Sequence, residues 1–301
     1  MCFCLSAFPA RILSADSKGT CGDGVKWEVE GEKLTVSYTG SGTGVMDNFN
    51  NEIEEKIDKA GGEEEYIYYY NCPWQAFRNS ISEVVISEGV TTIGNHAFAM
   101  LKNLKSVTIP EGVILIGKEA FEQSGYGNSE GFDVVIPGTV TSISDYAFSG
   151  ANLKNLIIKN GVTSIGEGAF MDCSLLTGVV IPASVVTIGN FAFYRCKGLV
   201  KVTGGAKLEQ IGTSAFAFCP ELKTFVITSR VLNKIGAYAF NEDKSLTVIS
   251  IKNTTKLNRA GVERSLKDSF VKTVKVKANK VKEYKKIFSG SISGRSVTVK
   301  R

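Results

Sequence analysis

Residues 176–196 read LTGVVIPASVVTIGNFAFYRC, and three short elements within this stretch decide the fold. An apolar run closes on Pro182, the dipeptide Ile-Gly follows at 188–189, and Ala-Phe comes next at 192–193. An apolar run closed by proline is typical of a short β-strand, and glycine after isoleucine suits a tight backbone turn. The same three elements recur on both sides of this stretch.

The pair Ala-Phe is the clearest periodic signal in the chain. Its eight phenylalanines are Phe77, Phe98, Phe121, Phe148, Phe170, Phe193, Phe216 and Phe240, with gaps of 21, 23, 27, 22, 23, 23 and 24 residues. Ile-Gly or Ile-Ser begins four residues before seven of the alanines, at Ile93, Ile116, Ile143, Ile165, Ile188, Ile211 and Ile235. Two motifs that stay in phase in this way indicate an internal repeat of about 23 residues.

A repeat of this size cannot bury its own apolar face, whereas stacked repeats bury a continuous one. The pattern therefore predicts a β-rich leucine-rich repeat solenoid, each repeat consisting of a strand, a turn, a short strand and a second turn. Each inward phenylalanine contributes about 2–3 kcal/mol of transfer free energy. The longest repeat carries several glycines within residues 125–131, which predict a loop extruded from one coil.

The combined pattern is close to L-x-x-V-x-I-P-x-x-V-T-x-I-G-x-x-A-F-x-x-C-x-x-L and covers about residues 81–251. It resembles the BspA-like leucine-rich repeats found in many bacterial surface proteins and in some protists. Residues 19–74 look like the cap that often precedes such repeats, and the segment 274–284 resembles the closing segment of the family. The resemblance implies an exported protein that binds macromolecules at a cell surface, and it leaves the ligand open.

Four segments follow from this pattern. Residues 1–15 are expected to be a signal segment, because they are apolar and end on small residues, although no Lys or Arg precedes the apolar stretch. Residues 16–80 are expected to form an N-terminal cap, residues 81–251 the solenoid, and residues 252–301 a basic C-terminal cap. We therefore expect a secreted or cell-surface location.

The net charge of +5 is unevenly distributed along the chain. Residues 251–301 carry 15 Lys or Arg and 3 Asp or Glu, a local charge of +12, which leaves −7 for the rest. A weakly acidic body with a basic end does not fit a nucleic-acid-binding domain, whose basic residues would line a working face. No apolar run approaches the length of a membrane span.

The basic segment has two interpretations. Its lysines alternate with Val271, Val274 and Val276 in the manner of an amphipathic strand followed by a helix, so the valines can close the last coil while the lysines face water. The alternative is that this segment binds an anionic cell-wall polymer.

Catalytic chemistry has few candidates in this sequence. A single histidine, His96, excludes His-pair zinc sites, and it falls at a variable turn position of the repeat. Cys173, Cys196 and Cys219 are 23 residues apart and are expected to stack as small wall residues, one per coil. We therefore expect no cofactor, no metal and no enzymatic activity.

Three further features lie in the expected N-terminal cap. Cys21 and Cys72 form a disulfide in one interpretation of an exported chain and remain thiols in the other. The acidic run 52–65 has apolar residues at helical spacing and is expected to form a short solvated helix. The tyrosines within 66–70 predict a strand at the cap edge or an aromatic binding patch.

Strand alternation also predicts which surface meets a partner. In L-x-x-V-x-I, the residue between Val and Ile points outward, giving the column Thr108, Val135, Ile157, Val180, Thr203 and Val226. A neighbouring basic margin contains Lys105, Lys154 and Lys223. This sheet face is the predicted binding site for a protein or glycan partner.

We therefore expect a binding or adhesion protein without catalysis. A structural spacer in a larger surface assembly is the first alternative, and it would have no ligand. A polysaccharide-acting enzyme is the weaker one, because acids should then recur on adjacent strands, and Asp133 is the only acid beside the quoted strand runs.

Overall fold

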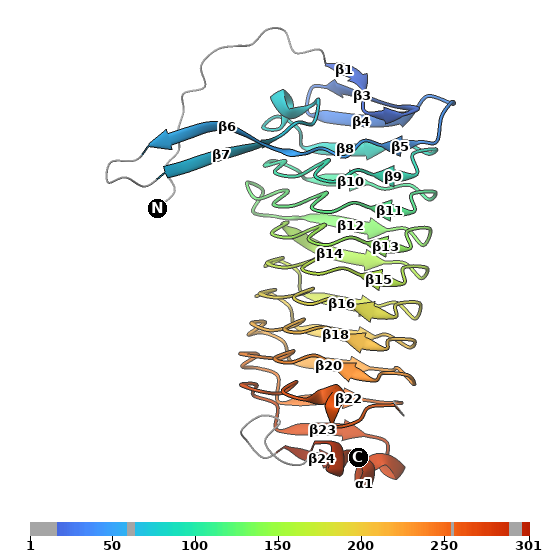
Figure 1. Ribbon diagram of the computed structural model, residues 1–301, viewed down its shortest axis with the longest axis vertical. Helices are drawn as coiled ribbons and strands as arrows, with labels where there is room; N and C mark the ends of the chain where they lie inside the picture. The colour runs from blue at the N-terminus through green and yellow to red at the C-terminus, as the bar shows by residue number, and fades with distance from the viewer. Residues whose placement is uncertain (1–16, 59–63, 254–255, 289–296) are drawn as a thin grey trace.

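The computed structural model describes residues 17–58, 64–253, 256–288 and 297–301. Figure 1 shows a single column of stacked coils, with the N-terminal strands at one end and the only α-helix of the described residues at the other. The predicted solenoid is confirmed. The expected signal segment 1–15 lies outside the described residues.

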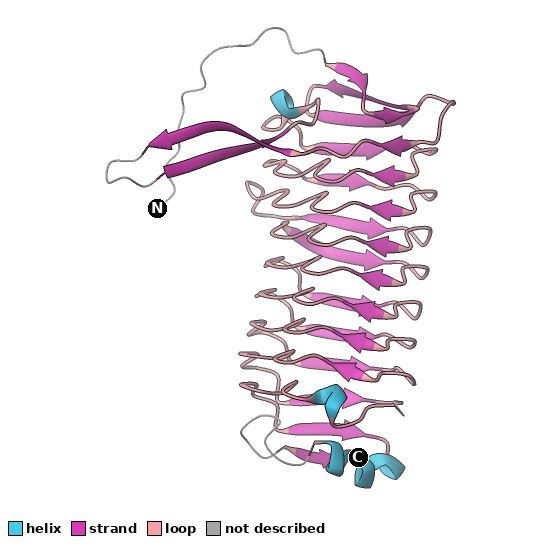
Figure 2. Cartoon of the chain, in the orientation of Figure 1, coloured by secondary structure: helices cyan, strands magenta, loops and turns pink. Residues whose placement is uncertain are grey.

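Among the described residues, seven repeats contain a long and a short strand, as predicted, and one further long strand follows them (Figure 2). The long strands are β8 (Glu83–Ile86), β10 (Ser106–Thr108), β12 (Phe132–Ile136), β14 (Leu153–Ile158), β16 (Gly178–Ile181), β18 (Lys201–Gly204), β20 (Thr224–Ile227) and β22 (Val248–Ile251). The two-residue strands are β9 (Thr92–Ile93), β11 (Leu115–Ile116), β13 (Ser142–Ile143), β15 (Ser164–Ile165), β17 (Thr187–Ile188), β19 (Gln210–Ile211) and β21 (Lys234–Ile235). The repeat strands pair in parallel with those of neighbouring coils, so equivalent residues of successive repeats lie side by side.

The N-terminal segment continues the same column. Its strands are β1 (Lys18–Thr20), β2 (Gly22–Asp23), β3 (Val25–Glu30), β4 (Lys33–Tyr38), β5 (Val45–Met46), β6 (Asn51–Asp58) and β7 (Glu64–Tyr70), followed by the 3-10 helix η1 (Gln75–Phe77). β4 pairs in parallel with β8 of the first repeat, and β5 pairs with β9. This segment therefore covers the first coil by extending both of its sheets.

The acidic run does not form the helix that its spacing predicts. β6 and β7 pair as an antiparallel hairpin that projects from the side of the column (Figure 1). The tyrosine-rich stretch 66–70 lies in β7, so the predicted strand is confirmed. Pairing with the following segment overrides a local helical pattern, because strand and helix preferences over such a short stretch differ by little.

The C-terminal segment closes the column with β23 (Thr273–Val276), α1 (Val281–Ile287) and β24 (Thr298–Lys300), and also contains the 3-10 helices η2 (Ala260–Val262) and η3 (Ala278–Lys280). β23 pairs in parallel with β22 and buries Val274 and Val276, while Lys275 between them is exposed. The predicted strand and helix are confirmed.

The core is a ladder of phenylalanine rings along the axis. The fully buried rings of Phe98, Phe121, Phe148, Phe170, Phe193, Phe216 and Phe240 lie 4.9 to 6.1 Å from their neighbours, centroid to centroid. The ring planes of most of these pairs are nearly parallel, with an interplanar angle of only 1° between Phe121 and Phe148. One ring per coil therefore fixes the vertical spacing of the coils.

The first member of the ladder is a tryptophan and not the predicted Phe77. Trp74 is fully buried and stacks on Phe98 at 5.7 Å, and its indole N–H donates to the carbonyl oxygen of Ala97 at 2.9 Å. Phe77 is half-buried against Trp27. The larger indole covers the open end of the ladder and also hydrogen-bonds to it, which a phenyl ring cannot do.

A second column runs beside the rings. Cys173, Cys196 and Cys219 are fully buried thiols that donate to the carbonyl oxygens of Phe148, Phe170 and Phe193 at 3.1 to 3.2 Å. Ser124 occupies the same place in an earlier coil and donates to Phe98 at 2.6 Å. The prediction that these cysteines are stacked wall residues is confirmed, and each also satisfies a buried carbonyl.

Asp243 is the exception in that column. Its side chain is fully buried, Oδ1 accepts from the backbone N–H of Cys219 at 2.8 Å, and Oδ2 has no partner among the described residues. Burial raises the pKa of the Asp243 carboxyl well above its ordinary value. A neutral acid is consequently favoured where the three preceding coils place a thiol.

Glycine follows isoleucine because successive coils approach closely at this point, and not because the turn needs a left-handed residue. A Cβ on Gly189 would lie 2.6 Å from the carbonyl carbon of Gly166 in the preceding coil. Two other positions of each repeat have a left-handed backbone. In the repeat of Gly189 they are Phe191 and Arg195, with φ of 55° and 58°. Their N–H groups donate to carbonyls of the next coil.

We predict that Phe170→Ala lowers the free energy of unfolding by about 3–5 kcal/mol, because it leaves a cavity between two stacked rings that cannot close. The matched control is Val180→Ala, because the Val180 side chain is 67% exposed. This substitution should change the free energy of unfolding by less than about 0.5 kcal/mol. Urea denaturation followed by circular dichroism measures both. Equal stability of the two variants would contradict a ring ladder that sets the coil spacing.

We predict that Asp243→Cys stabilises the protein at pH 7 by about 1–3 kcal/mol, because it replaces an unsatisfied buried carboxyl with the thiol of the sister coils. Folding raises the pKa of the Asp243 carboxyl. The protonated carboxyl therefore makes its full contribution to the free energy of unfolding below the unfolded pKa of about 3.9, and this contribution is lost as pH rises. The advantage of the variant should therefore shrink between pH 7 and pH 4 in urea denaturation. A constant difference across this range would contradict a neutral Asp243.

Candidate functional site

The predicted outward column lies in register on the face formed by the long strands. Val135 pairs with Ile157 across β12 and β14, and Val180, Thr203 and Val226 continue in register across β16, β18 and β20. Thr108 stands on β10, and its register partner is Val85 of β8. The structure thus places the predicted column on the face of the long strands, where the hydrogen-bonded ladder is interrupted between β10 and β12 and between β14 and β16.

The column is most exposed at its middle. The side chains of Val135, Ile157 and Val180 are 42%, 57% and 67% exposed. Thr203 and Val226 are half-buried. We define Val135, Ile157 and Val180 as the apolar patch, because an exposed β-branched row on neighbouring strands exceeds what strand formation needs.

Polar side chains surround the apolar patch. On the side of the strand starts, Asn155 Nδ2 donates to Asp133 Oδ1 at 2.8 Å. On the side of the strand ends, Lys159 Nζ lies 2.7 Å from Glu111 Oε1. The predicted margin residues Lys105, Lys154 and Lys223 are all exposed. An apolar centre with a polar rim is the usual composition of a protein-binding surface.

Few acidic side chains lie on the long strands. Asp133 of β12 accepts a hydrogen bond from Asn155, and Glu83 lies on β8. Within the described residues, no group of three His, Cys, Asp or Glu side chains converges as a metal site.

A cluster of aromatic side chains on the turn side is absent from the sequence-based prediction. Tyr194 lies edge-on to Phe191 at 5.6 Å and to Phe218 at 5.4 Å, and the guanidinium of Arg195 lies 5.6 Å from the Tyr194 ring. Phe191 and Phe218 occupy left-handed positions. The unusual placement of phenylalanine at variable turn positions was the available sequence signal.

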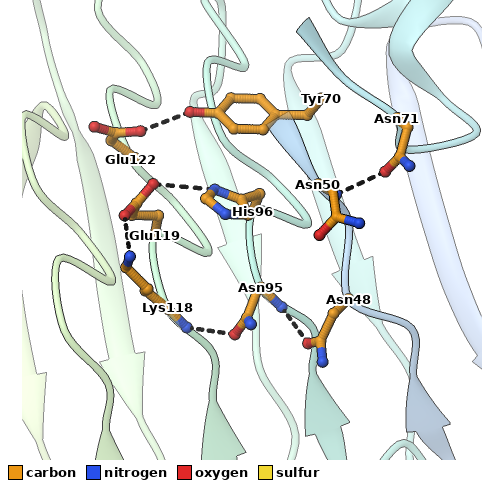
Figure 3. A network of polar contacts seen from close by, with 9 residues as sticks. All are labelled: Asn48, Asn50, Tyr70, Asn71, Asn95, His96, Lys118, Glu119 and Glu122. Carbon is orange, nitrogen blue, oxygen red and sulfur yellow. Dashed lines mark hydrogen bonds and ion pairs between the residues drawn. The ribbon is translucent and has the colours of Figure 1, made fainter. Parts of the chain in front are cut away.

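A polar cluster at the base of the β6–β7 hairpin is also new. Figure 3 shows Tyr70, the last residue of β7, beside His96, and their rings stack at 4.7 Å. The Tyr70 hydroxyl donates to Glu122 Oε2 at 2.7 Å, and His96 Nδ1 lies 3.2 Å from Glu119 Oε2. His96 therefore contacts the base of the hairpin, whereas the sequence analysis predicted no role for it.

Burial dominates the electrostatics of this cluster. It raises the pKa of the Tyr70 hydroxyl and of the Glu122 carboxyl above their ordinary values. It lowers the pKa of His96, although the nearby Glu119 carboxylate acts in the opposite direction. A neutral imidazole stacked on a neutral phenol is consequently the favoured state near pH 7.

The predicted disulfide pair Cys21 and Cys72 lies in the core of the N-terminal segment. Both residues are buried and are free thiols in this structure, and Cys72 Sγ lies 3.6 Å from Gln75 Oε1 of η1. Burial raises the pKa of each thiol to about 12, which disfavours the reactive thiolate. The disulfide stays a prediction for an exported chain.

The C-terminal segment exposes many of its lysines. Lys272, Lys275 and Lys277 face water from β23 and its ends, and Lys282, Lys285 and Lys286 are exposed on α1. The apolar residues between them are buried beneath the last coil. Among the described helices none is long and apolar enough to cross a membrane.

Stacked parallel strands, one ring per coil and turns at a repeat of about 23 residues define a leucine-rich repeat solenoid. The family model described as the BspA type leucine-rich repeat region matches six copies, within residues 73–175, 126–247 and 168–295. The chain therefore belongs to the BspA-type leucine-rich repeat family.

Several solved structures are similar to this chain. The pneumococcal vaccine antigen PcpA is 17% identical, with 95% of this chain and 98% of that chain covered and a TM-score of 0.48. A leucine-rich repeat protein of T. pallidum is 17% identical, with 74% and 88% covered and a TM-score of 0.41. One from Eubacterium ventriosum is 19% identical, with 85% and 84% covered and a TM-score of 0.38. Comparison with curated proteins gives no match.

Proposed function

We propose that this protein acts at a cell surface by binding a protein partner on the face of its long strands. The observation that carries the proposal is the apolar patch of Val135, Ile157 and Val180, whose side chains are exposed to water. Family membership supports the surface location and the binding role.

The shape of the face suits a macromolecule better than a small molecule. Parallel strands in register form a long surface, so a partner can contact several coils at once. Burying exposed apolar side chains contributes about 25 cal/mol for each Å² removed from water. The margin lysines Lys105, Lys154 and Lys223 add attraction for an acidic partner and speed its encounter.

The alternatives predicted from the sequence receive less support. A structural spacer has no need for exposed Ile157 and Val180 on adjacent strands, where polar residues would serve solubility better. A polysaccharide-acting enzyme needs two carboxylates across a cleft, whereas Asp133 is hydrogen-bonded to Asn155 on an open strand face.

We predict that the double substitution Ile157→Glu and Val180→Glu weakens partner binding at least about tenfold, because it places two carboxylates in the centre of the interface. Stability should change by less than about 1 kcal/mol, since both side chains are exposed. Biolayer interferometry against immobilised extracellular-matrix proteins and bacterial surface-protein fractions measures binding.

The matched control is the double substitution Ile114→Glu and Leu115→Glu. These side chains are 51% and 38% exposed and lie at β11, so the control adds the same charge away from the long-strand face. The control should bind as the unmodified protein does. Unchanged affinity of the Ile157 and Val180 variant would place the partner elsewhere.

A further inference from the structure

The longest repeat does more than extrude a loop. Residues 125–131 fold back and form one wall of a pocket of about 260 Å³, whose other walls come from the N-terminal segment and the turn before β10. The pocket brings together Glu32, Asn79, Ser82, Asn103, Lys105 and Ser129. These residues are far apart in sequence, and they meet only because the coils stack.

The loop that forms this wall is held by defined contacts. Asn152 Nδ2 donates to the carbonyl oxygens of Gly125 and Asn128, both at 3.1 Å, and Asn128 Nδ2 donates to Leu104 at 3.1 Å. The N–H of Gly127 donates to the carbonyl of Lys102 at 2.9 Å. The wall is thus pre-formed, and binding need not order it.

The residues that line the pocket are polar apart from Gly127, and hydrogen bonds hold two of their side chains in fixed orientations. Ser82 Oγ donates to Glu32 Oε2 at 2.6 Å, which fixes the carboxylate. Asn103 Nδ2 donates to the carbonyl of Asn79 at 2.6 Å, which directs its amide. Asn103 Oδ1, the hydroxyl of Ser129 and the ammonium of Lys105 have no hydrogen-bond or ion-pair partner among the described residues, so they are available to a ligand.

The loop that forms this wall also carries an exposed aromatic ring. Tyr126 precedes the lining residue Gly127, its side chain is 49% exposed, and Lys102 Nζ lies 5.9 Å from its ring centroid. A Cβ on Gly127 would lie 2.7 Å from Lys102 Cγ, so glycine allows this close approach. The same loop thus supplies polar lining residues and a flat apolar ring.

We propose that this pocket binds a neutral oligosaccharide. Sugar hydroxyls both donate and accept, and they match a lining with an oriented carboxylate, an amide, a hydroxyl and an ammonium. The apolar face of a pyranose ring packs on an aromatic side chain, which Tyr126 supplies. None of the apolar-patch residues Val135, Ile157 and Val180 lines the pocket, although the margin residue Lys105 does, so the pocket adds a second binding function to the one proposed above.

Other ligand classes match the lining less well. An anion would face the Glu32 carboxylate, and a metal ion would find a single carboxylate among these side chains. An apolar ligand would leave the amide and hydroxyl groups without partners, which costs free energy. The small volume fits one or two sugar rings of a longer chain.

The full chain can be tested with cellotriose, maltotriose and chitotriose as neutral probes and with sialyllactose as an acidic probe. Saturation-transfer NMR detects contact, and titration calorimetry gives the Kd. We expect at least one neutral probe to bind with a Kd of about 1 mM or tighter. No saturation transfer to any neutral probe, or a preference for sialyllactose, would overturn the proposal.

Two variants locate the site. Ser129→Trp fills the pocket and Asn103→Ala removes an oriented amide, so each should weaken binding at least about tenfold. Glu130→Trp is the matched control, because Glu130 neighbours Ser129 in the loop without lining the pocket. The Ile157 and Val180 double variant should keep full sugar affinity. Undiminished affinity of both pocket variants would overturn the site, whatever the outcome on the sheet face.

Discussion

Coil-on-coil stacking is the constraint on which the rest of the molecule depends. The ring-to-ring distances of 4.9 to 6.1 Å are close to the spacing of paired strands, about 4.7–4.9 Å, so the core and the hydrogen-bonded sheets share one rise. Each inward side chain must then fit between the equivalent side chains of the coils on either side of it. This requirement explains why phenylalanine, isoleucine and small wall residues recur while outward residues vary.

Binding surfaces can consequently arise only at positions that the contacts between coils do not constrain. Outward rows are free to change, and the exposed Ile157 and Val180 lie on such a row. Insertions are tolerated between strands, and the loop 125–131 provides the wall of the polar pocket at such a place. Both sites sit on a scaffold whose geometry does not depend on them, which allows binding properties to change without loss of the fold.

The predictable part of the structure is the part that repeats. Two motifs in phase and strand alternation were enough to place the ladder, the thiol column and the outward row. Trp74 replaces the expected Phe77 because the end of the ladder has different neighbours from its middle. The β6–β7 hairpin contradicts a helical spacing, since its pairing partner follows in sequence. The pocket unites Glu32, Asn103 and Ser129, whose proximity no local pattern contains.

The parallel ladders also determine how the protein responds to force. Because hydrogen bonds between coils run along the axis and the two caps lie at opposite ends (Figure 1), tension applied through the ends loads a few bonds at a time. Coils can then peel away singly, each lengthening the tether by about 80 Å. Each detached coil re-forms against an intact neighbour when tension falls. A solenoid of this design yields gradually under tension while its remaining coils stay folded.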